Sequence, residues 1–225
     1  MATCLLGFGD SWSAGSGLDF ANGEQDFVRL AARQFDIPCF NASIPGTGLP
    51  HLILQFKKFI GQHYHASVNY HAVFFLTAIE RDLCYNDNGT VEEINPRNPK
   101  FADYYAKIYS NDLAIFRLNT ILLSLHQLCQ HYGIYDHYIF GWQTPELWPE
   151  INRDNFWQQG QRSVLDLFLE DYPDAPRNII HLKENMNHPW IIKPQFAGDS
   201  NGGHPNQLGH EKIAQALIEW VDLCL

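Results

Sequence analysis

The sequence predicts a three-layer α/β/α sandwich built around a mainly parallel sheet of five strands. Short apolar runs alternate along the chain with longer stretches in which apolar residues recur at helical spacing. One run, 72–76, is apolar at every position, which is typical of a central strand covered on both faces. The 225 residues contain no repeat, linker or low-complexity tract, so we expect a single domain over 1–225.

The predicted elements follow one another in regular order. Apolar runs that end in glycine or polar turns predict strands at 3–9, 37–40, 72–76, 138–141 and 178–182. Helical spacing predicts helices at 24–35, 49–62, 101–132, 153–171 and 206–222. Two segments rich in Asn, Pro and Gly, 86–100 and 185–203, are expected to be loops. Strands that alternate with helices pair in parallel through crossovers, which indicates a flavodoxin-like arrangement.

Composition and charge exclude several classes of partner. The formal net charge is −10 and the sequence pI is near 5.4. Binding to a nucleic-acid backbone needs clustered Lys and Arg, whereas Lys57-Lys58 is the only adjacent basic pair here. No apolar stretch approaches the roughly 20 residues of a membrane-spanning helix. We therefore expect neither a nucleic-acid nor a membrane partner, and the sequence does not indicate an oligomeric state.

Cysteine usage and the start of the chain bear on the compartment. The cysteines are odd in number, scattered and without a CxxC pair: Cys4, Cys39, Cys84, Cys129 and Cys224. This pattern is typical of reduced, mostly buried thiols in a cytoplasmic protein. Residues 1–3 carry no basic charge, and a cleaved signal peptide would also remove Ser11. We therefore expect a cytoplasmic location.

Polar loops with small residues follow the predicted strands at the edge where such sheets bind ligands. They are 9–17, 41–48, 77–82 and 199–204. The first loop offers a serine, Ser11, and the last offers a histidine, His204. A hydroxyl is a poor nucleophile until a neighbouring base takes its proton, so these two residues from opposite ends of the chain indicate a serine esterase. Turn capping by Ser11 and packing at the start of a helix by His204 are the structural alternatives.

These loops together resemble the SGNH subgroup of the GDSL esterase/lipase family. The matching segments, in the family's order, are Gly9-Asp10-Ser11 with Gly15, Gly46 within 41–46, and His204-Pro205-Asn206 with Gly209-His210. The resemblance spans the chain and implies a carboxylic ester hydrolase of the three-layer SGNH type. It implies that Ser11 attacks the ester and that His204 acts as base, with no metal or organic cofactor.

The resemblance also implies an oxyanion hole, in which the backbone amides of Ser11 and Gly46 hold the developing negative charge. The third block of the family, Gly-x-Asn-Asp, is replaced here by Ile79-Glu80-Arg81-Asp82. Arg81 or Thr77 is the candidate for the missing asparagine donor, and the absence of that donor is the alternative. A surface salt bridge is the structural alternative for Arg81. Asp10 is expected to pin the loop by hydrogen bonds.

The triad acid departs from the family in its spacing. The family places an aspartate three residues before the histidine, where this chain has Asn201. Asp199, five residues before His204, is the candidate acid, and Gly202-Gly203 give the loop the flexibility to bring it back. A backbone carbonyl that orients His204 in a dyad is the alternative. His210 is expected to pack in the last helix.

Other motifs are weaker. Trp12 stands where a dinucleotide-binding loop needs its third glycine, and neither a P-loop nor GxSxG occurs. The histidines at 63, 65 and 71 match no zinc spacing. The tryptophans at 142, 148, 157 and 190 are expected in the core or in cleft walls, where any of them is able to stack on a sugar.

The expected partner is a small-molecule ester, with an acetyl group on a carbohydrate as the simplest substrate. A catalytically impaired binding protein and an acyltransferase remain the alternatives.

Overall fold

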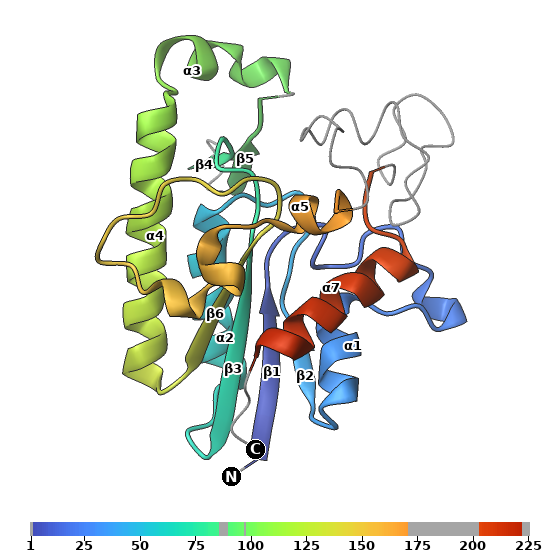
Figure 1. Ribbon diagram of the computed structural model, residues 1–225. Coiled ribbons are helices and arrows are strands. Elements are labelled where there is room, and N and C mark those ends of the chain that lie inside the picture. The colour runs from blue at the N-terminus through green and yellow to red at the C-terminus, as the bar shows by residue number, and fades with distance from the viewer. Residues whose placement is uncertain (1, 86–89, 97, 171–202, 222–225) are drawn as a thin grey trace.

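The computed structural model describes residues 2–85, 90–96, 98–170 and 203–221 (Figure 1). The strands are β1 (Ala2–Phe8), β2 (Cys39–Asn41), β3 (Val68–Leu76), β4 (Asp82–Tyr85), β5 (Val91–Ile94) and β6 (Tyr135–Phe140). The α-helices are α1 (Phe27–Gln34), α2 (Pro50–His63), α3 (Ala102–Lys107), α4 (Asn111–Tyr132), α5 (Val164–Phe168) and α7 (Gln207–Trp220). Short 3-10 helices are η1 (Phe20–Asn22), η2 (Pro99–Phe101), η3 (Arg153–Asn155) and η4 (Trp157–Gly160).

The main sheet is parallel, with the strand order β2-β1-β3-β6. Helices α2 and α4 cover one face, and α1 and α7 pack together on the other (Figure 1). This is the predicted three-layer α/β/α class. Four of the five predicted strands are present in the described residues, and the fifth, 178–182, lies outside them.

The pleat of the strands creates two hydrophobic cores. On β3, Phe74 faces the α2 and α4 side, whereas its neighbours Val73 and Phe75 face the α1 and α7 side. On β6, Phe140 and Ile139 divide between the two cores in the same way. Strands buried on both faces read as continuous apolar runs, which explains why 72–76 was recognisable from sequence.

Three of the local predictions were wrong. The predicted helix 101–132 is two helices, because Ser110 adopts an extended backbone and its hydroxyl oxygen accepts a hydrogen bond from Leu113 N, which starts α4 anew. The predicted helix 153–171 is interrupted by left-handed backbone at Gln158 and Gln159, and only α5 is α-helical within its described part. The predicted loop 86–100 contains β5, which pairs with β4 in an antiparallel hairpin.

Helix α7 begins where the sequence indicated. Its N-cap is Asn206, whose side-chain oxygen accepts a hydrogen bond from Gly209 N at 3.0 Å. One turn later, His210 is fully buried, and its Nδ1 accepts the backbone N–H of Phe27 at 3.2 Å. His210 therefore ties α7 to the start of α1, in agreement with the expected packing role. No helix in the described ranges is both long and apolar enough to cross a membrane.

Two imidazoles, one fully buried and one partly buried, are held neutral by the fold. Burial, helped by the charge of His204, lowers the pKa of His210 from 6.5 to about 3. On β6, burial and the neighbouring His71 lower the pKa of His137 to about 4. The Nε2 of His137 lies 3.1 Å from Nδ1 of His71, so a single proton is shared between these two nitrogens.

Acidification from pH 7 to pH 5 is expected to lower the free energy of unfolding, because the two histidines together outweigh the opposing contribution of Glu93, whose pKa is raised to about 7. In the unfolded chain His137 and His210 take up protons below about pH 6.5, whereas the fold keeps them neutral down to about 4 and 3. The loss approaches about 1.4 kcal/mol per histidine for each pH unit below 6.5. Urea unfolding at pH 7, 6 and 5 measures it. For a His210→Gln variant, the free energy of unfolding is expected to depend less steeply on pH. A His131→Gln variant, which changes an exposed histidine, is expected to keep the wild-type dependence. The same pH dependence for wild type and both variants would contradict this account.

Candidate active site

The structure brings Ser11 and His204 into contact although 193 positions separate them in the chain. Ser11 lies in the turn that directly follows β1, and His204 stands three residues before α7. The distance from Ser11 Oγ to His204 Nε2 is 3.0 Å, and both residues are partly exposed. A hydroxyl at hydrogen-bond distance from an imidazole nitrogen is the geometry that proton transfer requires.

Asp10 supports the turn that carries Ser11. This aspartate is fully buried, and its Oδ1 accepts the backbone N–H of Trp12 at 2.9 Å. Its other oxygen accepts the hydroxyl of Thr77, which follows β3, at 2.6 Å. The indole N–H of Trp142 donates in turn to Thr77 Oγ1 at 3.4 Å. The Thr77 hydroxyl proton is thus directed at Asp10. Through this hydrogen bond, Asp10 connects the residues that follow the carboxyl ends of β1 and β3, next to Ser11.

Gln55 fixes the end of β1 to the second polar loop. Its side-chain oxygen accepts Gly9 N–H at 3.0 Å, and its side-chain nitrogen donates to Gly9 O at 2.9 Å. Ile44 N also donates to Gly9 O, at 3.0 Å, so the loop with Gly46 lies along the nucleophile turn. Gln55 was not predicted from the sequence. The signal was an amide between Leu52 and Phe56 on the apolar face of a helix.

Two backbone amides at this edge have no acceptor among the described residues. In the described residues, no group accepts a hydrogen bond from the N–H of Ser11 or of Gly46. Gly46 has a φ of 79°, a left-handed conformation that favours glycine, and a Cβ there would meet nothing within 4 Å. An open, unpaired amide is the kind of donor that an oxyanion needs.

Arg81 is held between two acidic side chains and is only 20% exposed. Its Nη1 lies 4.0 Å from Asp10 Oδ2, and its Nε lies 3.5 Å from Glu93 Oε1. Burial raises the pKa of Glu93 to about 7, against the opposing effect of Arg81. Close to pH 7 the charge of Arg81 is therefore balanced mainly by Asp10.

The β4–β5 hairpin links this ion pair to the rest of the site. Glu93 lies on β5, and Arg81 immediately precedes β4. A Cβ on Gly48 would lie 2.9 Å from Arg81 Cβ, so the second loop packs directly on this arginine. Sequence reasoning did not find Glu93, because the strand that carries it was taken for loop.

Asp199 lies outside the described residues, so its role as the triad acid stays a prediction. The backbone amides of Ser11 and Gly46 are described, but their role as oxyanion donors also stays a prediction. Trp190 lies outside the described residues as well. Trp142 lies against Trp12, with 4.3 Å between ring centroids, and Trp148 packs against Phe116.

Solved structures match nearly the whole chain, whereas no protein-family model and no curated protein sequence matches it. The structure of TesA matches with a TM-score of 0.51 and 16% identity, over 99% of each chain. A lipolytic protein of the G-D-S-L family from Veillonella parvula matches with a TM-score of 0.46 and 15% identity, over 97% of each chain. A catalytic mutant of an acetylxylan esterase from Geobacillus stearothermophilus matches with a TM-score of 0.45 and 12% identity, over 99% of this chain and 97% of that one. The match to TesA shows that the protein shares its fold, and the parallel sheet covered by helices on both faces confirms the predicted fold class.

Proposed function

We propose that this protein is a serine esterase of the SGNH/GDSL hydrolase family that cleaves a carboxylic ester through an acyl-enzyme on Ser11. The observation that carries the proposal is the 3.0 Å contact between Ser11 Oγ and His204 Nε2. The shared fold supports it, because the contact lies just beyond the carboxyl end of a central parallel strand, where sheets of this kind bind ligands.

Each residue has a defined task in the reaction. His204 Nε2 removes the proton of the Ser11 hydroxyl as Oγ bonds to the ester carbonyl carbon. The tetrahedral intermediate then collapses, its bond to the alcohol oxygen breaks, and His204 returns the proton to the leaving alcohol. Water repeats the two steps on the acyl-enzyme and releases the carboxylic acid. No cofactor takes part in this scheme.

The amides of Ser11 and Gly46, which donate to no group in the described part of the chain, are the proposed oxyanion donors. Gln55 and Asp10 hold the two loops that carry these amides, so little reorganisation is needed as charge develops on the carbonyl oxygen. Arg81 is the candidate third donor in place of the family's asparagine, because Nη1 is buried without a hydrogen-bond partner in the described residues. Thr77 is the weaker candidate, since its proton points to Asp10.

The proposal also covers the triad acid, the substrate and the cellular location. Asp199 is the proposed acid that orients His204, with a backbone carbonyl as the alternative. A small acyl group, such as acetyl on a carbohydrate, is the proposed substrate. The proposed location is the cytoplasm, which cell fractionation tests directly.

A fluorophosphonate probe tests the proposal. Stoichiometric labelling of the intact protein, located on Ser11 by peptide mass spectrometry, is the expected result, together with turnover of p-nitrophenyl acetate. A folded protein that shows neither labelling nor turnover would instead be the impaired binding protein. Turnover in the presence of a competing alcohol separates hydrolysis from acyl transfer, because only a transferase passes most acyl groups to the alcohol.

A further inference from the structure

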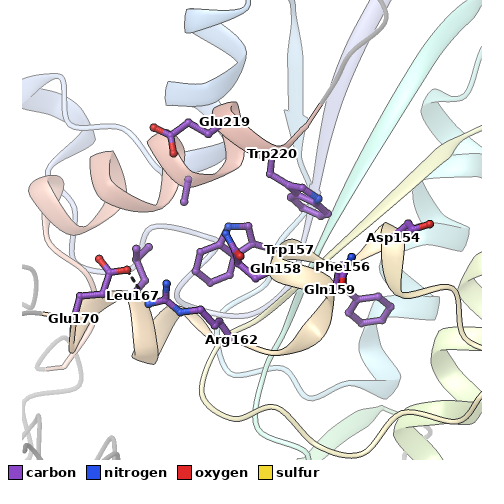
Figure 2. Close-up of a pocket in the computed structure, with 11 residues that line it drawn as sticks. Asp154, Phe156, Trp157, Gln158, Gln159, Arg162, Leu167, Glu170, Glu219 and Trp220 are labelled. Carbon is purple, nitrogen blue, oxygen red and sulfur yellow. Dashed lines mark hydrogen bonds and ion pairs between the residues drawn. The ribbon is translucent and has the colours of Figure 1, made fainter. Parts of the chain in front are cut away.

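A cavity of about 510 Å³ opens between η4, α5 and α7 (Figure 2). Its size falls in the range of roughly 300–1,000 Å³ that small-molecule sites occupy. Trp220, which ends α7, is one of its walls, whereas His204 precedes the other end of that helix. The α7 residues that line the cavity lie in the second half of the helix, and neither Ser11 nor His204 lines it, so this cavity is separate from the Ser11–His204 contact.

The lining combines aromatic surface with planar polar groups. Trp157 and Leu167 form a buried floor, and Trp220 is half-buried at the side (Figure 2). The exposed polar side chains of the lining are those of Asp154, Gln158, Gln159, Glu170 and Glu219. Amide and carboxylate groups next to an indole offer both hydrogen-bond partners and an apolar surface.

Strained backbone holds the two glutamines in this lining. Gln158 and Gln159 have φ values of 50° and 55°, a left-handed conformation that is unfavourable for residues with a Cβ. The segment is pinned at both ends, because Phe156 bridges to Tyr138 and Ser163 bridges to Phe140 on β6. Strain of this kind persists where the surroundings enforce it, and it concentrates at ligand sites.

The charges around the cavity narrow the chemistry of a ligand. Arg162 is paired with Glu170 at 2.7 Å, and its guanidinium lies 5.8 Å from the centre of the Trp157 ring. That ring is therefore already occupied by a cation. Asp154 and Glu219 leave the rim negative, which disfavours phosphates and carboxylates. The indole of Trp220 and the amides of Gln158 and Gln159 fit an uncharged ligand that has many hydroxyl groups and one apolar face.

We propose that this cavity binds an uncharged saccharide ring, with Trp220 against the apolar face of the sugar and the side chains of Gln158 and Gln159 on its hydroxyls. The site would hold a glycan at a distance from the ester-cleaving centre. Its existence does not depend on the proposed esterase activity, since no residue of the lining belongs to the candidate active site.

Isothermal titration of the full chain with unesterified xylohexaose, cellohexaose, maltohexaose and chitohexaose tests the site. Saturable binding of at least one of them is expected. Gln158→Gly is expected to weaken that binding about tenfold, the equivalent of one hydrogen bond. The same change is expected to raise the thermal midpoint, because glycine relieves the left-handed strain. Trp220→Ala is expected to weaken binding by at least as much.

Gln161→Gly is the matched control, since Gln161 is exposed, has a φ of −89° and is not part of the lining. It is expected to leave sugar binding unchanged and to lower the thermal midpoint. Binding of none of the four oligosaccharides, wild-type affinity in Gln158→Gly, or tighter binding of spermidine than of any sugar would overturn the proposal. Hydrolysis of p-nitrophenyl acetate by the same variants reports separately on the esterase, and it is expected to stay at the wild-type level.

Discussion

Replacement of Ser11 by alanine is expected to lower kcat/KM for p-nitrophenyl acetate by at least about 10⁴-fold, with little change in the thermal midpoint. The variant keeps the amides of Ser11 and Gly46, and therefore the proposed oxyanion hole, but it has no oxygen to attack the carbonyl. In serine hydrolases the loss of the nucleophile removes most of the rate enhancement, and the remainder comes from the oxyanion hole and binding.

Ser16→Ala serves as the control for Ser11→Ala. Ser16 lies in the same turn, where its backbone N–H donates a hydrogen bond to Ser11 O at 2.9 Å. Its hydroxyl has no place in the proposed mechanism, so activity within about twofold of wild type is expected, because a surface substitution of this kind changes little. Steady-state kinetics on purified, folded protein measures both variants. Comparable turnover by Ser11→Ala and wild type would exclude this serine as the nucleophile.

Asp10→Ala is expected to lower the free energy of unfolding by about 3–5 kcal/mol, the cost of removing one partner of a buried charged network. The carboxylate is fully buried and accepts hydrogen bonds from Trp12 N and the Thr77 hydroxyl. Without it these donors lose their acceptor, and Arg81 loses the partner that balances its charge near pH 7. Activity is expected to fall as well, because the turn that carries Ser11 loses its support.

Urea unfolding at pH 7 measures the effect, with Asp103→Ala as the control. Asp103 is a highly exposed carboxylate paired with Lys107 at 2.9 Å. Exposed pairs of this kind contribute about 0–1 kcal/mol, so the control is expected to unfold close to the wild-type midpoint. Equal stabilities for Asp10→Ala and Asp103→Ala would mean that the buried network does not support the fold.

The sheet was predictable from sequence because its strands are covered on both faces. Runs such as 72–76 contain no polar residue and are recognisable without knowledge of their neighbours. The segment 153–171 was not predictable, because its apolar spacing imitates a helix while tertiary contacts with β6 force left-handed backbone at Gln158 and Gln159. The hairpin was missed because β5 has only four residues, two of them charged.

The part of the site that was predictable from sequence is the part whose proposed chemistry needs particular residue types, a serine and a histidine, in recognisable motifs. Ser11 and His204 were predicted as a pair because the proposed chemistry needs both a nucleophile and a base, and the structure places the two side chains in contact. Gln55 and Glu93 contribute to the site through contacts with Gly9 and Arg81, which lie 46 and 12 positions away. Partners of this kind become visible only when the chain is folded.

The distance along the chain between Ser11 and His204 has a consequence during translation. The ribosome adds roughly 5–20 residues per second, so the 193 positions between them correspond to roughly 10–40 s of synthesis. Throughout that interval the nascent polypeptide carries the serine without its imidazole. Under the proposed mechanism, newly made chains are therefore unable to attack cellular esters until nearly their full length has left the ribosome.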